Sequence, residues 1–133
     1  MPRMIFVNLP VKSVGESRTF FGKLGFDFNP QFSDEHVACM VVDDNIFVML
    51  LEEARFKDFI NGDIADAHRT TEVLTCLSAG SREEIDRTVR TAIEAGGKPW
   101  KEPMEEGPMY GGSFQDLDGH VWELIFMEEP GRG

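Results

Sequence analysis

A short acidic motif near the end of the chain carries the residues best suited to chemistry. The segment from Asp116 to Ile125 reads DLDGHVWELI. Its Asp and Gly residues favour a tight turn, and the Val, Trp, Leu and Ile that follow favour a β-strand. Glu123 interrupts this apolar strand, and a carboxylate in such a place is costly unless something pairs with it. Glu123 is therefore the candidate for a catalytic or ligand-binding group.

The alternation of side chains along a strand predicts which residues share a face with Glu123. Val121 and Ile125 lie on its side, whereas Trp122 and Leu124 lie on the other side and are expected to pack against helices. On the wall of a pocket, Glu123 can act as a general base or hold a cationic or hydroxylated ligand. The alternative is a structural carboxylate that pairs with the backbone or an Arg.

The elements that must position this motif form a pattern that occurs twice. Apolar and β-branched runs predict four strands in each half, at residues 4–11, 26–32, 37–42 and 46–51 and at 72–77, 98–101, 110–115 and 121–126. The capping boxes Ser13-x-x-Glu16 and Ser81-x-x-Glu84 each begin a helix after the first strand of a half. Both halves therefore have the order βαβββ, which indicates an internal duplication.

The two halves are expected to form a single domain that spans residues 1–133. Its modules cover about 4–51 and 72–128, and a connector at 52–70 joins them, with a short helix favoured at 53–60. The segment 103–112 is rich in Pro, Gly and Glu, so we expect a loop there. This loop is interpreted either as a lid or rim of a pocket, with Tyr110 as a ligand contact, or as an ordinary surface loop.

Composition excludes several classes of partner. With 13 basic and 24 acidic residues, the formal net charge is −11, which argues against nucleic acid as a partner. No apolar stretch approaches the roughly 20 residues needed to cross a bilayer, and the first residues do not read as a secretory signal. Cys39 and Cys76 lie in separate apolar runs and are expected to be buried free thiols. These features favour a cytoplasmic protein that is not attached to a membrane.

A duplicated βαβββ unit that ends in Asp-x-Asp-Gly-x-x-x-Glu-Leu resembles the vicinal oxygen chelate superfamily. This group includes glyoxalase I, bleomycin-resistance proteins, fosfomycin-resistance enzymes and extradiol dioxygenases. The resemblance covers the chain from Met4 to about Glu128. It implies an α+β fold in which the mixed sheets of two βαβββ modules form a cup that binds a small molecule, the glyoxalase/bleomycin-resistance fold. It also implies a homodimer.

The resemblance further implies where a divalent metal would be held, on the first and last strands of each module. These positions fall on Phe6 and Met49 in the first module and on Leu74 and Glu123 in the second, where 123 − 49 = 74 relates the last strands. Metal ions of this kind normally take three or four N or O ligands from the protein, and only Glu123 offers one. We therefore predict no cofactor, and Glu123 is a metal ligand only if a metal is present.

The same positions and the alternation along their strands give a mainly apolar lining for the cup. Besides Glu123 and Cys76, the predicted ligand contacts are Phe6, Asn8, Phe47, Met49, Leu74 and Tyr110. The favoured function is small-molecule binding without the usual metal, with or without acid–base catalysis by Glu123. One alternative is a metal-dependent lyase, isomerase or dioxygenase with displaced ligands, drawn from His36, Glu72 and Glu123. The other is sequestration of a cationic drug of the bleomycin type, which the acidic charge permits.

Overall fold

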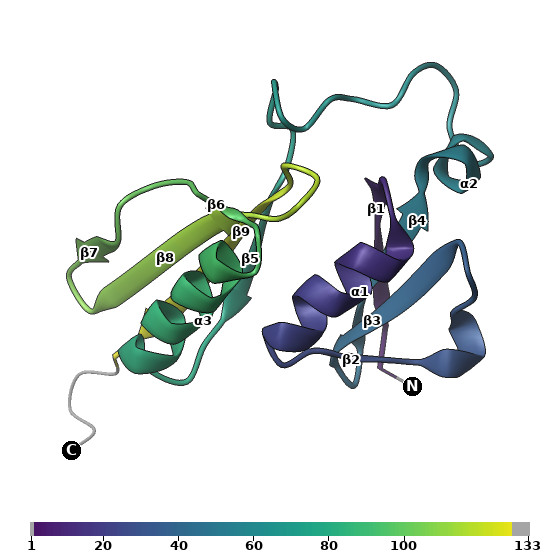
Figure 1. Ribbon diagram of the computed structural model, residues 1–133. Helices are drawn as coiled ribbons and strands as arrows, with labels where there is room; N and C mark the ends of the chain where they lie inside the picture. The colour runs from purple at the N-terminus through teal and green to yellow at the C-terminus, as the bar shows by residue number, and fades with distance from the viewer. Residues whose placement is uncertain (1, 129–133) are drawn as a thin grey trace. The chain divides into compact units, whose positions relative to one another are not determined.

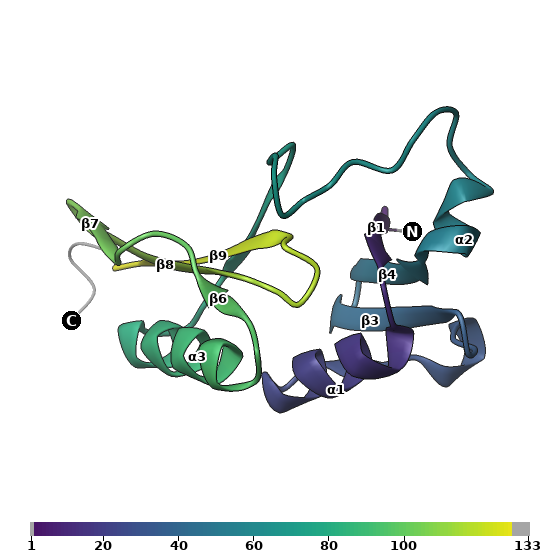
Figure 2. The ribbon, with the colours of Figure 1, turned by 45° about the horizontal axis from the view of Figure 1, so that its top comes forward.

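The computed structural model describes residues 2–128, and the chain divides into two compact units, Met1–Ala65 and Asp66–Gly133 (Figure 1). This division falls inside the predicted connector. Each unit contains one β-sheet with a long helix along one of its faces (Figure 2). That the two units act as a single domain stays a prediction.

The first unit contains a four-stranded sheet. Its elements are β1 (Ile5–Val11), α1 (Val14–Lys23), β2 (Asp27–Phe28), the 3-10 helix η1 (Pro30–Phe32), β3 (Val37–Asp43), β4 (Ile46–Glu52) and α2 (Glu53–Lys57). The strand order is β1-β4-β3-β2, in which β1 runs parallel to β4 and the other pairs are antiparallel. The parallel pair requires a crossover, which α1 and the strands after it supply.

The second unit repeats this arrangement. Its elements are β5 (Leu74–Ser78), α3 (Arg82–Glu94), β6 (Lys98–Pro99), β7 (Met104–Glu106), β8 (Met109–Gln115) and β9 (Val121–Met127). The strand order is β5-β9-β8-β6, with β5 parallel to β9 and β7 paired to the same edge of β8 as part of the sheet. The predicted α+β fold of two repeated units is confirmed.

Both predicted capping boxes begin their helices. The Ser13 hydroxyl oxygen accepts the backbone N–H of Glu16 at 3.1 Å, and the Ser81 hydroxyl oxygen accepts that of Glu84 at 3.0 Å. These bonds satisfy N–H groups that have no partner within the first turn of a helix. The carboxylate of Glu84 also accepts the backbone N–H of Gly80, the residue before the N-cap Ser81, at 3.3 Å.

Four predicted elements differ from the structure, one of which is the strand expected at 98–101, shortened to β6. The strand expected at 26–32 is shortened to β2, because the Asn29 side chain accepts the N–H of Gln31 and Pro30 then starts a 3-10 turn. The loop expected at 103–112 is in part a β-hairpin of β7 and β8. The helix expected at 53–60 ends at Lys57.

The core of each unit lies between the sheet and its helix. In the first unit the buried side chains include Leu9, Val48 and Leu50 from the strands and Phe20 and Phe21 from α1. In the second they include Phe114, Trp122 and Leu124 from the strands and Ile85 and Ala92 from α3. Alternation then turns every second residue of β1, β4, β5, β8 and β9 to the face opposite the helix. No helix in the part of the chain described here is long and apolar enough to span a membrane.

Candidate functional site

Strand pairing places Glu123 in the middle of the second sheet. β5 brings Cys76 opposite Glu123 from one side, and β8 brings Ser113 opposite it from the other. Residues that face each other across paired strands point to the same side of the sheet. Cys76, Glu123 and Ser113 therefore form a row on the face opposite α3, as the alternation along β9 predicted for Glu123.

A hollow of about 300 Å³ lies on this face around Glu123. Its walls are mainly apolar and soft, and they include Met104, Met109 and Ile125 together with Cys76 and Gly111. The Ser113 hydroxyl oxygen accepts the backbone N–H of Lys101 at 3.1 Å, which holds the segment between β6 and β7 beside the hollow. The hollow is therefore a feature of the second unit alone, built from β5, β7, β8 and β9.

Glu123 is half-buried in the wall of this hollow. No group among residues 2–128 donates a hydrogen bond to its carboxylate or forms an ion pair with it. Partial desolvation of the sulfur by the surrounding wall, and to a lesser extent the charge of Glu123, raise the pKa of the neighbouring Cys76 thiol, although the residue as a whole is exposed. Cys76 therefore stays a neutral thiol beside Glu123 and is poorly suited to act as a nucleophile.

Cys76 differs in one respect from the expectation for the two cysteines. Both are free thiols, but Cys39 is buried whereas Cys76 is exposed. The prediction of a buried thiol is therefore wrong for Cys76. It lies on edge strand β5, on the face that α3 does not cover.

The acidic turn before β9 fixes the start of the strand that carries Glu123. The Asp116 carboxylate accepts the indole N–H of Trp122 at 2.9 Å and the backbone N–H groups of Asp118 and His120 at 2.9 and 3.0 Å. Asp116 is 3% exposed, and this burial raises the pKa of its carboxyl, partly offset by His120 and by the donated hydrogen bonds. Gly119 completes the turn with a φ of +87°, a conformation that favours glycine.

The corresponding face of the first unit carries different chemistry. The register of β1 against β4 pairs Phe6 with Phe47 and Asn8 with Met49. The two phenyl rings stack with their centroids 4.9 Å apart and an interplanar angle of 12°. The Asn8 side-chain amide donates to the backbone carbonyl of Phe6 at 3.1 Å. These four predicted ligand contacts thus share one face of one sheet.

The register also shows that the four positions implied for a metal are structurally equivalent in pairs. Phe6 is the register partner of Phe47, and Leu74 is the register partner of Val121. Phe47 and Val121 are 74 positions apart (121 − 47 = 74), as Met49 and Glu123 are. Phe6 is therefore equivalent to Leu74, and Met49 is equivalent to Glu123. Phe6, Met49 and Leu74 offer an aromatic ring, a thioether and an alkyl chain, so the donor set does not fit a hard divalent ion. In the described chain, no three His, Cys, Asp or Glu side chains form a group that could hold a metal ion.

Tyr110 does not share the face of Glu123. Its register partner on β9 is Phe126, so its ring points toward α3, where its hydroxyl donates to the Asp86 carboxylate at 2.5 Å. The Arg82 guanidinium lies over the Tyr110 ring, 4.9 Å from its centroid, and also pairs with Glu105. Tyr110 therefore joins β8 to α3 in this unit, and the geometry does not bring it to the hollow.

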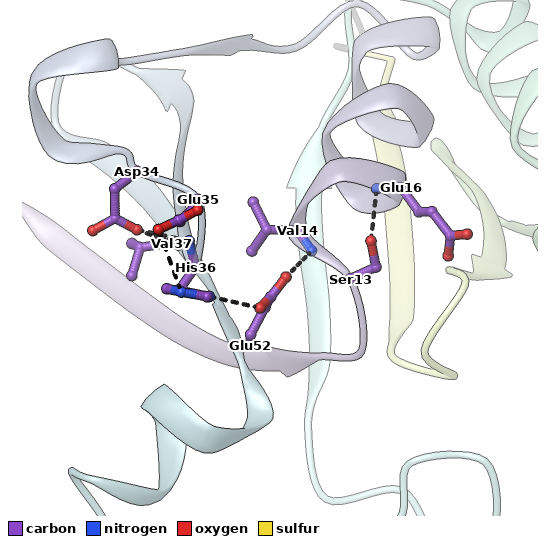
Figure 3. A network of polar contacts seen from close by, with 8 residues as sticks. All are labelled: Ser13, Val14, Glu16, Asp34, Glu35, His36, Val37 and Glu52. Atoms are coloured by element: carbon purple, nitrogen blue, oxygen red, sulfur yellow. Dashed lines mark hydrogen bonds and ion pairs between the residues drawn. The ribbon is translucent and has the colours of Figure 1, made fainter.

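The residues proposed as displaced metal ligands have other surroundings. Glu72 is exposed and precedes β5. His36 precedes β3, and its imidazole Nδ1 lies 2.9 Å from the Glu52 carboxylate, whose other oxygen accepts the Val14 N–H at 3.0 Å (Figure 3). The hydrogen bond with Glu52 raises the pKa of His36, and the same bond with His36 lowers that of Glu52. This network ties β3 and β4 to the start of α1.

Sequence reasoning offered segment 103–112 as a possible rim of the pocket but did not single out Gly111, Met104 and Met109, which line the hollow. The two methionines lie in the segment interpreted as a loop, and the Gly111-Gly112 pair gave no sign of which glycine faces which side. The alternation along β8 could have identified them, but only once one pairing with β9 is known. The Ser113–Glu123 pair shows which residues of β8 share the face of Glu123.

Residues 3–43 match the family model described as bleomycin resistance protein-like N-terminal. No curated protein sequence matches the chain significantly. Among solved structures, a hypothetical protein from S. aureus is similar, with 28% identity, a TM-score of 0.80 and 95% of each chain covered.

Two more distant structures share the fold. A glyoxalase/bleomycin resistance protein/dioxygenase family enzyme from Burkholderia phytofirmans PsJN has 15% identity and a TM-score of 0.77, over 95% of this chain and 99% of that one. The fosfomycin resistance protein FosX from Listeria monocytogenes has 14% identity and a TM-score of 0.66, over 95% and 93%. The chain therefore has the fold of the glyoxalase/bleomycin resistance protein/dioxygenase structures, and its first unit is similar to the bleomycin resistance protein-like N-terminal family.

Proposed function

We propose that the chain binds a small organic molecule in the hollow on the second sheet, and that it does so without a divalent metal. The observation that carries this proposal is the Glu123 carboxylate, which is half-buried in a mainly apolar wall and has no hydrogen-bond partner among residues 2–128. Partial burial of a carboxylate is costly unless a donor or a cation pairs with it. A ligand with an amine or hydroxyl group beside an apolar part supplies that partner.

The chemistry available to such a site is acid–base chemistry. A carboxylate within reach of a bound C–H or O–H group can accept its proton, and the apolar walls exclude water around it. Cys76 adds a neutral thiol, and Ser113 is already engaged by Lys101. Binding is therefore the primary activity that we propose, and proton transfer by Glu123 is the reaction that this binding permits.

The test is a titration of the ¹⁵N-labelled protein with a library of fragments that carry amine, hydroxyl or carboxylate groups, followed by NMR. We expect amines and alcohols to shift the amide signals of Cys76, Ser113 and Glu123, and the Glu123→Gln variant to bind them more weakly. Glu83→Gln, which removes an exposed carboxylate on α3, is the matched control and should bind like wild type. Equal binding by wild type and Glu123→Gln would contradict the proposal.

Metal-dependent chemistry is the competing proposal, and elemental analysis separates the two. Protein purified without chelator should contain no stoichiometric nickel, zinc, iron or manganese, because three of the four aligned positions offer no hard donor. A stoichiometric metal that is lost in Glu123→Gln would instead support a lyase, isomerase or dioxygenase.

A second candidate function is capture of a cationic drug. It is favoured by the match of residues 3–43 to a bleomycin resistance protein-like model and by the net charge of −11. Calorimetric titration with bleomycin tests it, and a complete absence of heat at several temperatures would count against it. The homodimer and the cytoplasmic location stay predictions, and light scattering would test the first of them.

A further inference from the structure

The two adjacent glycines of β8, Gly111 and Gly112, are present for different reasons. A Cβ on Gly112 would lie 2.6 Å from the Ile85 side chain and 3.2 Å from Val89, so α3 can approach the sheet only because Gly112 has no side chain. A Cβ on Gly111 would meet only ordinary contacts, 3.6 Å from the Leu124 carbonyl oxygen and 3.8 Å from Ile125. The packing of the second unit therefore explains Gly112 and does not explain Gly111.

The backbone does not require glycine at position 111 either. Gly111 is not among the glycines with a positive φ. It lies inside the sheet, paired with Ile125 of β9 on one side and with Met104 of β7 on the other. Glycine is disfavoured in such a position because it has no side chain to pack and loses more conformational freedom on folding.

The internal repeat shows which residue the fold accepts at this position. Ile125 corresponds to Leu51 by the offset that relates the two units (125 − 51 = 74), and Leu51 is paired with Val37 of β3. The first unit thus carries Val37 where the second carries Gly111. A β-branched residue is compatible with this position in the fold, and the exception occurs in the unit where Gly111 lines the hollow.

We propose that Gly111 sets the depth and shape of the Glu123 hollow and is its specificity-determining residue. This proposal rests on the proposed function. Without a side chain at 111, a slot remains between Met104 and Ile125, floored by the backbone of β8. The slot accepts a flat apolar group, while Glu123 receives the donor or cationic head of the same molecule.

The spacing of the two positions defines the class of ligand further. Glu123 lies two residues from Ile125, the partner of Gly111, so it is the diagonal neighbour of Gly111. Diagonal neighbours on one face of a sheet are about 7–8 Å apart. A compact aryl-alkyl amine or alcohol, with two or three bonds between its ring and its head group, reaches from one to the other. The carboxylates of Glu102 and Glu123 outnumber the single ammonium of Lys101 in the lining, which favours a cationic head.

The test compares two amine probes, 2-phenylethylamine and n-butylamine, in NMR titrations of wild type and Gly111→Val. Both probes present an ammonium group to Glu123, but only the first needs the slot. We expect Gly111→Val to weaken binding of 2-phenylethylamine about tenfold or more and to leave that of n-butylamine within about twofold, because the added methyl groups fill the slot. Gly111→Ala should give an intermediate loss for the aromatic probe.

Ser78→Val is the control, since it places a valine on the same face of the sheet but outside the lining of the hollow. It should leave the ratio of the two affinities at the wild-type value. If wild type binds both probes around Glu123 and Gly111→Val keeps the wild-type ratio, the role of Gly111 is wrong and the proposed function stands. If neither probe shifts signals around Glu123 in wild type, the proposed function and this inference are both overturned.

Discussion

The two units have the same strand register and opposite surface chemistry on the face that their helices leave uncovered. In the first unit this face carries the stacked rings of Phe6 and Phe47, and Met49 lies beside Asn8. In the second unit the face carries Glu123 and the hollow around it. The helix-covered faces of both are apolar and buried. The comparison teaches that the repeated fold depends on the packed face, whereas the opposite face is free to differ between the units.

The acidic groups of the two units also serve different ends. In the second unit Asp116 is buried under three donated N–H groups, while Glu123 has no partner among the described residues. In the first unit the corresponding turn begins at the exposed Asp43. The Glu52 carboxylate at the end of β4 pairs with His36 and accepts the backbone N–H of Val14 at the start of α1 (Figure 3). The first unit thus commits its well-placed carboxylate to structure.

Replacement of the turn aspartates should show the largest difference between the units. Asp116→Ala leaves the Trp122 indole N–H and two backbone N–H groups without their acceptor, so we expect it to lower the free energy of unfolding by about 3 kcal/mol. Asp43→Ala, which removes an aspartate from the corresponding turn of the first unit, should cost less than about 0.5 kcal/mol, because the side chain is exposed. Urea denaturation of both variants measures the two costs. Similar costs would show that the two turns are energetically equivalent.

A smaller effect is expected where the helix packs on the sheet. Ala38 occupies in the first unit the position of Gly112 in the second, as the pairings with Leu50 and Leu124 show (124 − 50 = 74). Gly112→Ala should cost about 1–3 kcal/mol of stability, because its Cβ would lie 2.6 Å from Ile85 and α3 must move. The neighbouring Gly111→Ala is the control and should be close to neutral in thermal denaturation. A neutral Gly112→Ala would show that α3 packs no more tightly than α1.

The smallest effect is the pH dependence of the His36–Glu52 pair. The raised pKa of His36 means that its contribution to stability is complete below the ordinary value of 6.5 and is lost as the pH rises through the raised pKa. The lowered pKa of Glu52 means that its contribution is present above 4.5 and is lost as the pH falls through the lowered pKa. The pair therefore stabilises the first unit most between these two ordinary values.

Thermal denaturation of wild type and His36→Gln at about pH 5.5 and about pH 8.5 tests this contribution. The melting temperature of wild type should be higher than that of the variant at the lower pH, and the two values should approach each other at the higher pH. The difference should be small, because the His36 side chain is 60% exposed. His68→Gln, which alters a histidine of the other unit, is the control. An unchanged difference at both pH values would contradict the role of the pair.

Much of the fold followed from the sequence because its signals were local and repeated. The two Ser-x-x-Glu boxes predicted the starts of α1 and α3. The alternation along β9 correctly placed Trp122 on the buried face of the sheet and Glu123 on the other face. Which residues of β8 face α3 could not be predicted in this way, because that depends on the register between β8 and β9. Tyr110 was expected beside the ligand as part of a rim loop, and it lies instead against Asp86 of α3.

The candidate site was predictable only in its central residue. Glu123 could be identified because a carboxylate in an apolar strand costs free energy unless another group pairs with it. The hollow beside Glu123 depends on the missing side chain at Gly111 and on the β7–β8 hairpin, which places Met104 opposite Gly111. Neither feature can be predicted from the residue pattern of a single strand. The equivalence of Phe6 to Leu74 and of Met49 to Glu123 was read from the turns, and the strand registers agree with it.

The most direct test of this account is the NMR titration with amine and alcohol fragments, read over both units in one experiment. We expect the shifted signals to cluster at Cys76, Ser113 and Glu123 and those of Phe6 and Met49 to stay unchanged, and we expect Glu123→Gln to remove most of the effect. Fragments that bind at the Phe6–Phe47 face of the first unit, with no response around Glu123, would contradict it.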